Sequence, residues 1–146
     1  MTLSKFSRCS EHRIRRRVQF HETDAAGIVH FSCYFRYIEE AEHALWREAG
    51  LSIRGNSDVG FPRVATACEF HRPLRFEDEF EVWIRIAAID EKTIRYACTL
   101  TRDDERIATG TLTIICVTTG VGQPMKATAI PPAIAARFEA APGDKS

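Results

Sequence analysis

Five stretches of this chain have the composition of β-strands, and four of them follow one another after a single long helical pattern. Alternating apolar and polar residues are typical of half-buried strands. The stretches are 14–20, 64–70, 80–86, 94–100 and 107–118. Two acidic segments, Asp90-Glu91-Lys92 and Asp103-Asp104-Glu105, lie where hairpin turns are needed. One strand, one helix and then an antiparallel meander predict an α+β domain with the helix packed on one face of the sheet.

The helical pattern covers residues 34–49. Its apolar positions recur at the three- and four-residue spacing of a helix face and are Tyr34, Ile38, Ala41, Leu45 and Ala49. Ser32 is the predicted N-cap and Gly50 the C-terminal stop. After Pro131-Pro132 a short second helix is predicted over 133–139.

Length and charge limit the protein class. A chain of 146 residues is predicted to be one domain, with a core over about 13–135 and loose ends at 1–11 and 140–146. Lys plus Arg equals Asp plus Glu at 20 each, so the surplus of positive charge expected of a nucleic-acid partner is absent. No apolar run approaches the roughly 18–20 residues that span a bilayer, and the first residues do not form a secretory signal. We therefore expect a cytoplasmic protein with no membrane or nucleic-acid partner.

Neither the cysteines nor the charged clusters predict a metal or disulfide site. The five cysteines are odd in number and form no C-x-x-C pair, and Cys68, Cys98 and Cys116 are expected in the core. Glu40 and His43 have the Glu-x-x-His spacing of di-iron bundles, but a second such motif is missing. The remaining charges are expected on solvated faces of the first strand and the helix: Arg13, Arg15, Arg16, Arg17, Arg36, Glu39, Glu40, Glu42 and Arg47.

Two groups near the predicted helix start have catalytic potential. Cys33 lies close to His30, and a thiol in the first helical turn has its pKa lowered by the helix dipole. Asp24 lies seven residues before Phe31, in a loop whose turn point is Gly27. A turn there could bring the carboxylate over the helix start, where free N–H groups stabilise an oxyanion. Asp24 also has an ordinary interpretation as a turn residue.

Two segments resemble the 4-hydroxybenzoyl-CoA thioesterase family of hotdog-fold proteins. The first runs from Val18 to Ala41 and contains F-H-E-T-D-A-A-G-I-V-H-F-S-C-Y, which is similar to the family signature F-x-[DE]-T-D-x-x-G-[IV]-V-x-[FH]-x-x-Y. The second, Phe70 to Asp78, reads F-H-R-P-L-R-F-E-D and looks like the link between two strands in that family. The resemblance extends over about residues 13–135.

The resemblance implies a hotdog fold, a long central helix wrapped by a curved antiparallel sheet. It also implies homodimers or homotetramers with acyl-CoA sites at the subunit interface, and hydrolysis without a cofactor. Asp24 matches the catalytic carboxylate, acting as nucleophile or as general base on water, and Phe31 matches the backbone N–H that polarises the carbonyl. The residues that the resemblance assigns to substrate binding are Gly27, His30, Tyr34, Glu39, Phe61, Pro62, Arg63 and Lys92.

Two departures from the family pattern leave rival functions open. Some relatives carry histidine at the position of Phe31, and here only the adjacent His30 is present. The turn Asp90-Glu91-Lys92 carries two acids where some relatives present arginines to CoA phosphates, leaving Lys92, Arg63 and Arg72 as candidates. The rivals are a non-catalytic hotdog that binds acyl-CoA or acyl-carrier protein, and a dehydratase of 3-hydroxyacyl thioesters that uses His30. The acyl group itself is not indicated, although Phe31, Tyr34, Phe35 and Phe61 could line an aromatic slot.

Overall fold

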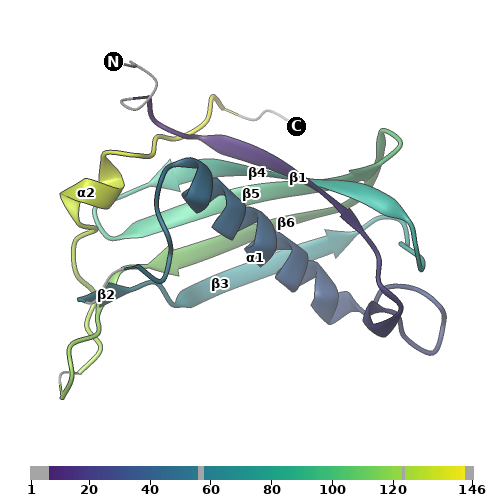
Figure 1. Cartoon of the computed structure of the whole chain (residues 1–146), viewed down its shortest axis with the longest axis horizontal. Helices are drawn as coiled ribbons and strands as arrows, with labels where there is room; N and C mark the ends of the chain where they lie inside the picture. Colours follow the sequence, from purple (N-terminus) through teal and green to yellow (C-terminus); the bar gives the residue numbers. More distant parts are fainter. Residues whose placement is uncertain (1–6, 56–57, 123, 144–146) are drawn as a thin grey trace.

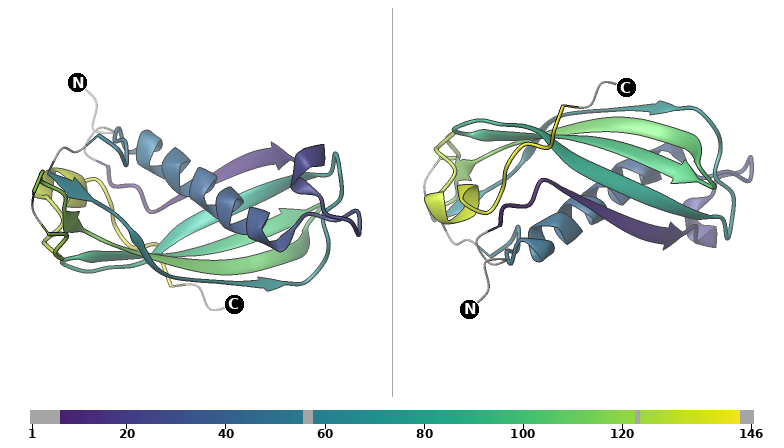
Figure 2. Two further views of the ribbon diagram at one scale, coloured as in Figure 1. Left: turned by 90° about the horizontal axis from the view of Figure 1, so that it is seen from below. Right: turned by 90° about the horizontal axis from the view of Figure 1, so that it is seen from above.

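A five-stranded antiparallel sheet and one long helix make up most of the molecule. The computed structural model describes residues 7–55, 58–122 and 124–143. The sheet has the order β1-β4-β5-β6-β3, formed by β1 (Glu11–Arg17), β4 (Glu79–Ile89), β5 (Thr93–Arg102), β6 (Glu105–Ile115) and β3 (Arg63–Phe70). Helix α1 (Phe31–Glu48) crosses one face of this curved sheet (Figure 1 and Figure 2). The predicted α+β hotdog arrangement is confirmed.

Four short elements complete the described part of the chain. A 3-10 turn, η2 (Phe20–Glu22), leads from β1 towards the loop before α1. The strands β2 (Val59–Gly60) and β7 (Val117–Thr118) pair with each other, and α2 (Pro132–Ala135) follows them. These last three elements gather at one end of the molecule, opposite the start of α1 (Figure 1).

The apolar face of α1 packs on the inward side chains of the central strands. All five helix positions predicted to be apolar and inward are buried, and Tyr37 and Trp46 extend the same face. One close approach is at Gly110 on β6, where a Cβ atom would lie 2.8 Å from Ile38 Cδ1. A side chain in place of Gly110 would displace the Ile38 side chain, so glycine favours the close packing of helix and sheet here.

The start of α1 differs from the prediction in its cap. His30, not Ser32, is the N-cap, because the His30 Nδ1 atom accepts a hydrogen bond from the Ser32 N–H at 3.2 Å. The helix begins at Phe31 and ends before Gly50, whose φ of 81° confirms the predicted stop. An imidazole nitrogen serves here in the role that Ser, Thr, Asp and Asn oxygens usually fill.

The first strand is shifted towards the N-terminus relative to the predicted 14–20. It spans Glu11–Arg17, and the chain then turns so that Val18 is buried while Phe20 is 72% exposed. Val18 and Phe20, which a strand over 14–20 would place on one face with Ile14, therefore lie outside β1 and do not share a face. The turn arises because the Glu22 side chain accepts the Gln19 N–H at 2.8 Å and closes a capping box around η2.

Strand β3 lies at the edge of the sheet and is exposed along most of its length. The alternation of Val64, Thr66, Cys68 and Phe70 predicts one buried face, but Val64 is 56% and Phe70 48% exposed. The prediction fails here for two reasons. Helix α1 covers mainly the central strands, and β3 is an edge strand with one neighbour, β6. The free edge of β3 is available for further pairing.

The segments near both termini are partly ordered. The Cys9 N–H donates to the Arg137 carbonyl at 2.8 Å, and the Ala141 N–H donates to the Ile86 carbonyl at 2.8 Å. Both Cys9 and Ala141 lie in the predicted loose ends and make these contacts, whereas residues 1–6 and 144–146 lie outside the described part of the chain. The second helix is shorter than the predicted 133–139 and spans Pro132–Ala135.

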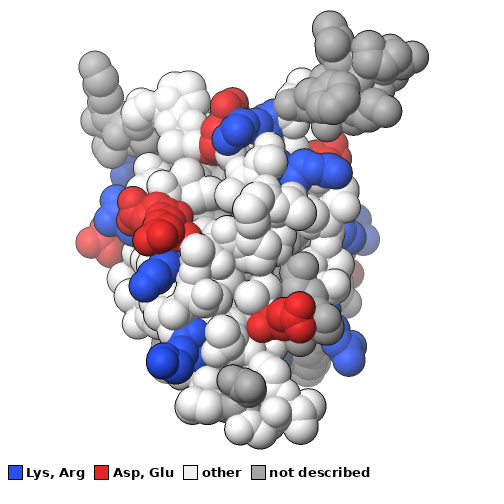
Figure 3. Space-filling model, turned by 90° about the vertical axis from the view of Figure 1, so that its left-hand side faces the viewer, with Lys and Arg blue, Asp and Glu red and all other residues white. Residues whose placement is uncertain are grey.

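Charges are mixed over the end of the molecule that carries β2 and α2. Figure 3 shows Lys and Arg interspersed with Asp and Glu on this face, and most of the drawn surface is uncharged. Among the described residues no helix is both long and apolar enough to cross a membrane.

Candidate active site at the start of the long helix

The loop that carries Asp24 is a tight turn closed by its own backbone. Thr23 and Val29 form an isolated antiparallel β-bridge, and the Asp24 N–H donates to the Ile28 carbonyl at 2.8 Å. Gly27 has φ of 80°, which confirms it as the turn point. Asp24 Oδ1 accepts the N–H groups of Ala26 at 2.8 Å and Ile28 at 3.4 Å. In the described part of the chain Oδ2 has no hydrogen-bond partner, so one carboxylate oxygen is anchored and the other is open.

The first N–H of α1 is also open. The Ser32 N–H is taken by His30 Nδ1, and the Cys33 N–H donates to the His30 carbonyl at 2.9 Å. For the Phe31 N–H there is no acceptor among the described residues, as expected for the first position of a helix. The Phe31 ring is 61% exposed and lies 4.6 Å from the His30 ring, centroid to centroid. The helix start therefore offers one unpaired donor beside an exposed aromatic surface.

The Asp24 loop is fixed to the segment that links β3 to β4. The Val29 N–H donates to the Leu74 carbonyl at 2.8 Å, and Ile28 bridges Arg75. Asp78 holds that segment in turn, since its Oδ2 accepts the Arg75 N–H and an Arg102 guanidinium N–H, each at 2.8 Å. The second sequence motif thus supports the first.

A buried carboxylate that the sequence analysis did not single out lies beneath the loop. Glu22 is 7% exposed, and its carboxylate accepts hydrogen bonds from the Arg16 guanidinium and the Tyr37 hydroxyl. Arg16 was expected among the solvated arginines, and that expectation is wrong for it alone: Arg13, Arg15 and Arg17 are exposed. The period of two places Arg16 on the same face of β1 as Ile14, and this signal could have identified it.

A groove of about 280 Å³ lies between α1 and the β3–β6 side of the sheet. We call it the α1–β3 groove, and its lining residues are Ser32, Phe35, Arg36, Ile38, Glu39, Arg63, Thr66 and Leu112. It begins beside the helix start and brings Glu39 and Arg63 together. The Arg63 guanidinium donates to Glu39 Oε2 at 3.0 Å and also pairs with Glu42.

The pairing of Arg63 corrects another expectation. Glu42 was expected on the helix surface, but its side chain is fully buried. Burial raises the pKa of Glu42, and the neighbouring Arg63 opposes that rise. Glu42 lies four residues after Ile38 and three before Leu45, so its position in the apolar stripe was visible in the sequence. Arg63 is thus committed to two carboxylates within its own chain.

Three other predicted contact residues, Tyr34, Phe61 and Pro62, have partners in the core or in the sheet. Tyr34 is 3% exposed, and its ring lies 4.9 Å from that of Phe70. Phe61 packs on Trp46 with ring centroids 5.1 Å apart, and the Pro62 carbonyl accepts the Ile115 N–H. Tyr34 and Phe61 are therefore core aromatic residues in this chain.

Lys92 lies at the opposite end of the sheet. The Asp24 loop follows β1, whose last residue pairs with the first residue of β4, whereas Lys92 lies beyond the last. The 11 residues of β4 separate the two ends by roughly 35 Å. Arg72 lies 3.4 Å from Glu105, an exposed ion pair. Within one chain these cations are not assembled into a phosphate site.

The residues considered for rival chemistries have partners within the fold. Burial, followed by the nearby Glu22 carboxylate, raises the pKa of the Cys33 thiol, opposite to the lowering expected from the helix dipole. His30 uses Nδ1 as the cap of α1, and Ser32 Oγ lies 2.8 Å from the same nitrogen. Glu40 binds Arg16, and the described residues contain no group of three or more His, Cys, Asp or Glu side chains arranged to hold a metal.

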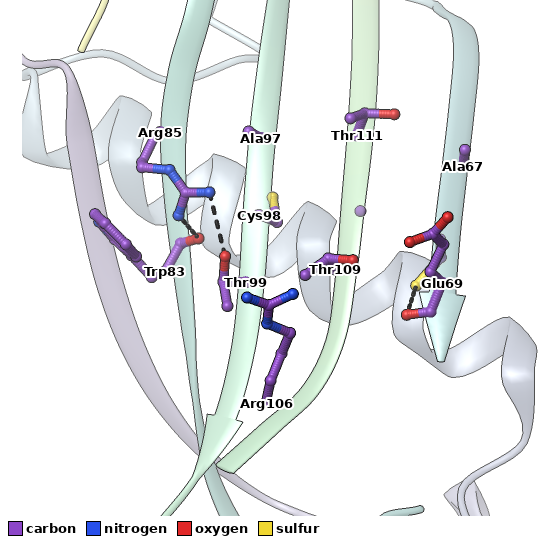
Figure 4. Close-up of a pocket in the computed structure, with 12 residues that line it drawn as sticks. Ala67, Glu69, Trp83, Arg85, Ala97, Cys98, Thr99, Arg106, Thr109 and Thr111 are labelled. Atoms are coloured by element: carbon purple, nitrogen blue, oxygen red, sulfur yellow. Dashed lines mark hydrogen bonds between the residues drawn. The ribbon is translucent and has the colours of Figure 1, made fainter. Parts of the chain in front are cut away.

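A second, larger hollow of about 620 Å³ lies on the sheet face that α1 does not cover. Figure 4 shows its lining on β3 to β6, with Arg85 directed towards Thr99 and the helix behind the sheet. Its floor consists of small residues such as Ala97 and Gly110, and Trp83 lies on one side. None of the predicted site residues line this hollow, so its size does not make it the site.

Comparison with known proteins identifies the family of this chain. The sequence model of the thioesterase-like superfamily matches residues 18–138, which includes both motifs. The chain belongs to the thioesterase-like superfamily. A 1,4-dihydroxy-2-naphthoyl-CoA hydrolase from Acaryochloris marina is 31% identical over 108 residues, which are 70% of this chain and 79% of the relative.

Solved structures extend the likeness within the thioesterase-like superfamily to nearly whole chains. The crystal structure of a hypothetical protein from Aquifex aeolicus has a TM-score of 0.80 and 31% identity, covering 88% of this chain and 99% of that one. A gentisyl-coenzyme A thioesterase has a TM-score of 0.77 and 26% identity, covering 85% and 99%. The finer resemblance to the 4-hydroxybenzoyl-CoA thioesterase family stays a prediction.

Proposed function

We propose that this protein hydrolyses an acyl-CoA thioester to the free acid and CoA at the start of α1. The observation that carries the proposal is the pair of uncommitted groups at the two ends of one short loop. Asp24 keeps Oδ2 open while Oδ1 is anchored, and the Phe31 N–H has no acceptor among the described residues. Membership of the thioesterase-like superfamily and the names of its CoA-thioesterase relatives support a thioester hydrolase activity.

In the proposed reaction the Phe31 N–H donates to the thioester carbonyl oxygen and stabilises the negative charge that develops there. Asp24 either attacks the carbonyl carbon, forming an anhydride that water then cleaves, or takes a proton from the attacking water. The C–S bond breaks in both cases, and CoA leaves as a thiolate that is then protonated. Water supplies the new oxygen of the acid.

The α1–β3 groove is the proposed place of the acyl group. It starts at Ser32, next to the Phe31 N–H, and Phe35 lines it further along α1. Phe35 offers an aromatic surface to an aryl group, and Glu39 is a polar group in the same wall. The relatives whose names specify aromatic acyl-CoA substrates support testing this substrate class first.

A second copy of the chain is proposed to complete the site. The free edge of β3 exposes Val64 and Phe70, and it borders the α1–β3 groove through Arg63 and Thr66. Pairing of two β3 edges would cover these apolar side chains and bring the second copy to the groove. The CoA moiety would then run out between the two subunits.

The test is release of CoA from aryl-, short-chain and long-chain acyl-CoAs by the unmodified protein and by Asp24→Asn. Turnover that falls at least about a hundredfold in Asp24→Asn, with its fold retained, supports the proposal. Asp78→Asn is a structural comparison, because Asp78 anchors the neighbouring segment through Oδ2 and is not part of the Asp24 loop. Full activity of Asp24→Asn on the best substrate would refute the assignment of Asp24. Tight binding of acyl-CoA without turnover by the unmodified protein would instead support a binding module.

A further inference from the structure

The side chain of Glu22 is held by four donors from three parts of the fold. Arg16 on β1 donates to both oxygens, at 3.0 Å to Oε1 and 2.7 Å to Oε2. The Tyr37 hydroxyl of α1 donates to Oε1 at 2.9 Å, and the Gln19 N–H donates to the same atom at 2.8 Å. Such a bidentate, charge-assisted arrangement is among the most directional that side chains form.

The main chain of Glu22 connects this anchor to both proposed catalytic groups. Its carbonyl accepts the His30 N–H at 2.9 Å, and His30 immediately precedes the Phe31 donor. The Cys33 thiol lies 3.6 Å from the same carbonyl oxygen. In the other direction the chain reaches Asp24 in two residues. Glu22 therefore lies at the junction where the Asp24 loop returns to the start of α1.

Arg16 is itself fixed, so the anchor is rigid. Its Nη2 lies 3.2 Å from Glu40 Oε2, its Nε also donates to Glu40, and its guanidinium carbon lies 4.7 Å above the Tyr37 ring. Burial alone would raise the pKa of Glu22, but the Gln19, Arg16 and Tyr37 donors outweigh it and hold that pKa below its ordinary value. Glu22 stays ionised at neutral pH, and the ion pair ties β1 to α1 beneath the loop.

We propose that Glu22, which is held by hydrogen bonds from Arg16 and Tyr37, is a positioning residue that sets the separation between the Asp24 carboxylate and the Phe31 N–H. This inference rests on the function proposed above. Glu22 is buried under the loop and contacts no substrate in this role. Because a displacement of about 1 Å at a reacting centre can cost roughly a hundredfold in rate, loss of the anchor acts on the chemical step rather than on binding.

The test compares Glu22→Gln with Glu79→Gln. Glutamine keeps the volume of the Glu22 side chain but removes its charge. Glu79 is the control because it is an exposed carboxylate that pairs with Arg17 where β1 ends and β4 begins. We expect kcat of Glu22→Gln to fall at least tenfold with KM within about threefold, and both constants of Glu79→Gln to stay within twofold. Tyr37→Phe removes one donor only, and we expect a smaller loss of kcat in the same direction. If Glu22→Gln does not fold, the positioning role is tested by comparing kcat of Tyr37→Phe with kcat of Glu79→Gln.

A second readout separates this inference from the proposed activity. The His30 amide donates to the Glu22 carbonyl, so its hydrogen exchange reports the anchor without any substrate. We expect exchange at His30 to accelerate at least tenfold in Glu22→Gln and to be unchanged in Glu79→Gln. If the unmodified protein has no turnover, the proposed function is refuted. Hydrogen exchange at His30 still tests whether Glu22 holds the start of α1 in place. Unchanged His30 exchange, or a kcat within twofold of the unmodified protein, would overturn the positioning role.

Discussion

Arg63 directs its guanidinium inward onto Glu42, a carboxylate that is fully buried in the face of α1. Tyr96 also hydrogen-bonds Glu42 and accepts the Trp46 indole N–H at 3.0 Å, so the pair is continuous with the core. A second carboxylate, Glu39, binds Arg63 from the solvent side. Arg63, which was expected to contact CoA phosphates, thus pairs with two carboxylates of α1.

Removing Arg63 should destabilise the fold in a pH-dependent way. Arg63→Met leaves the Glu42 charge buried without its partner, which costs about 3–5 kcal/mol at neutral pH. Burial raises the pKa of Glu42 above its ordinary 4.5, and loss of Arg63 raises it further. The folded state therefore takes up a proton more readily than the unfolded chain, and the penalty shrinks as pH falls from 7 towards 4.5.

Urea unfolding of Arg63→Met and the unmodified protein at pH 7 and pH 5 measures this difference. The control is Arg63→Met made in a Glu42→Gln background, where the buried group is neutral at every pH. There we expect the cost of losing Arg63 to be under about 1.5 kcal/mol and nearly independent of pH. A deficit that stays constant with pH in Arg63→Met alone would contradict an ionised Glu42.

Phe31→Pro should abolish the proposed oxyanion donor with little effect on the helix. Proline is favoured at the first helical position, and His30 has φ of −64° and ψ of 139°, which suit the residue before proline. Phe31→Ala removes the same ring and keeps the N–H. Initial rates should fall about 10²–10³-fold in Phe31→Pro and less than tenfold in Phe31→Ala. Equal losses in both variants would assign the effect to the ring.

Gly27→Ala should lower activity, whereas Gly122→Ala should not. Both glycines have positive φ, 80° and 75°, and an added Cβ would meet nothing within 4 Å at either position. Each substitution therefore carries only the backbone cost, about 1–2 kcal/mol. Gly27 lies between the two N–H groups that anchor Asp24, so its distortion moves the carboxylate. Thermal unfolding and kcat of both variants check this, and matching kcat values would contradict the role of the turn.

Charge placed on the β3 edge should control assembly. If two β3 strands pair antiparallel about Ala67, Val64 of each copy lies opposite Phe70 of the partner subunit, because both residues are three positions from that centre. Val64→Glu or Phe70→Lys alone should favour monomers and lower kcat, while Val64→Glu/Phe70→Lys should restore the dimer through cross-strand ion pairs. Sedimentation velocity measures the mass of each variant. A double variant that remains monomeric would exclude this register.

The local patterns in the sequence determined the elements and the order in which they occur. Period-two and helical spacing predicted α1 and the central strands, because each element has to bury one face of its own residues. Gly27 and Gly50 marked turns for an equally local reason, since positive φ suits glycine. The motif around Asp24 and Phe31 is continuous in sequence, so the proposed site could be located before any packing was known.

Only the tertiary structure decided which charged side chains pair with one another and which element is left uncovered. Arg16 meets Glu40 across 24 residues, and Arg63 meets Glu42 across 21, so neither pair has a local signature. Composition alone assigns such side chains to the surface because isolated charges are costly to bury. Packing of α1 over the central strands also left β3 exposed, which its alternating pattern did not predict. These features depend on contacts between distant segments, and such contacts exist only once the sheet has formed.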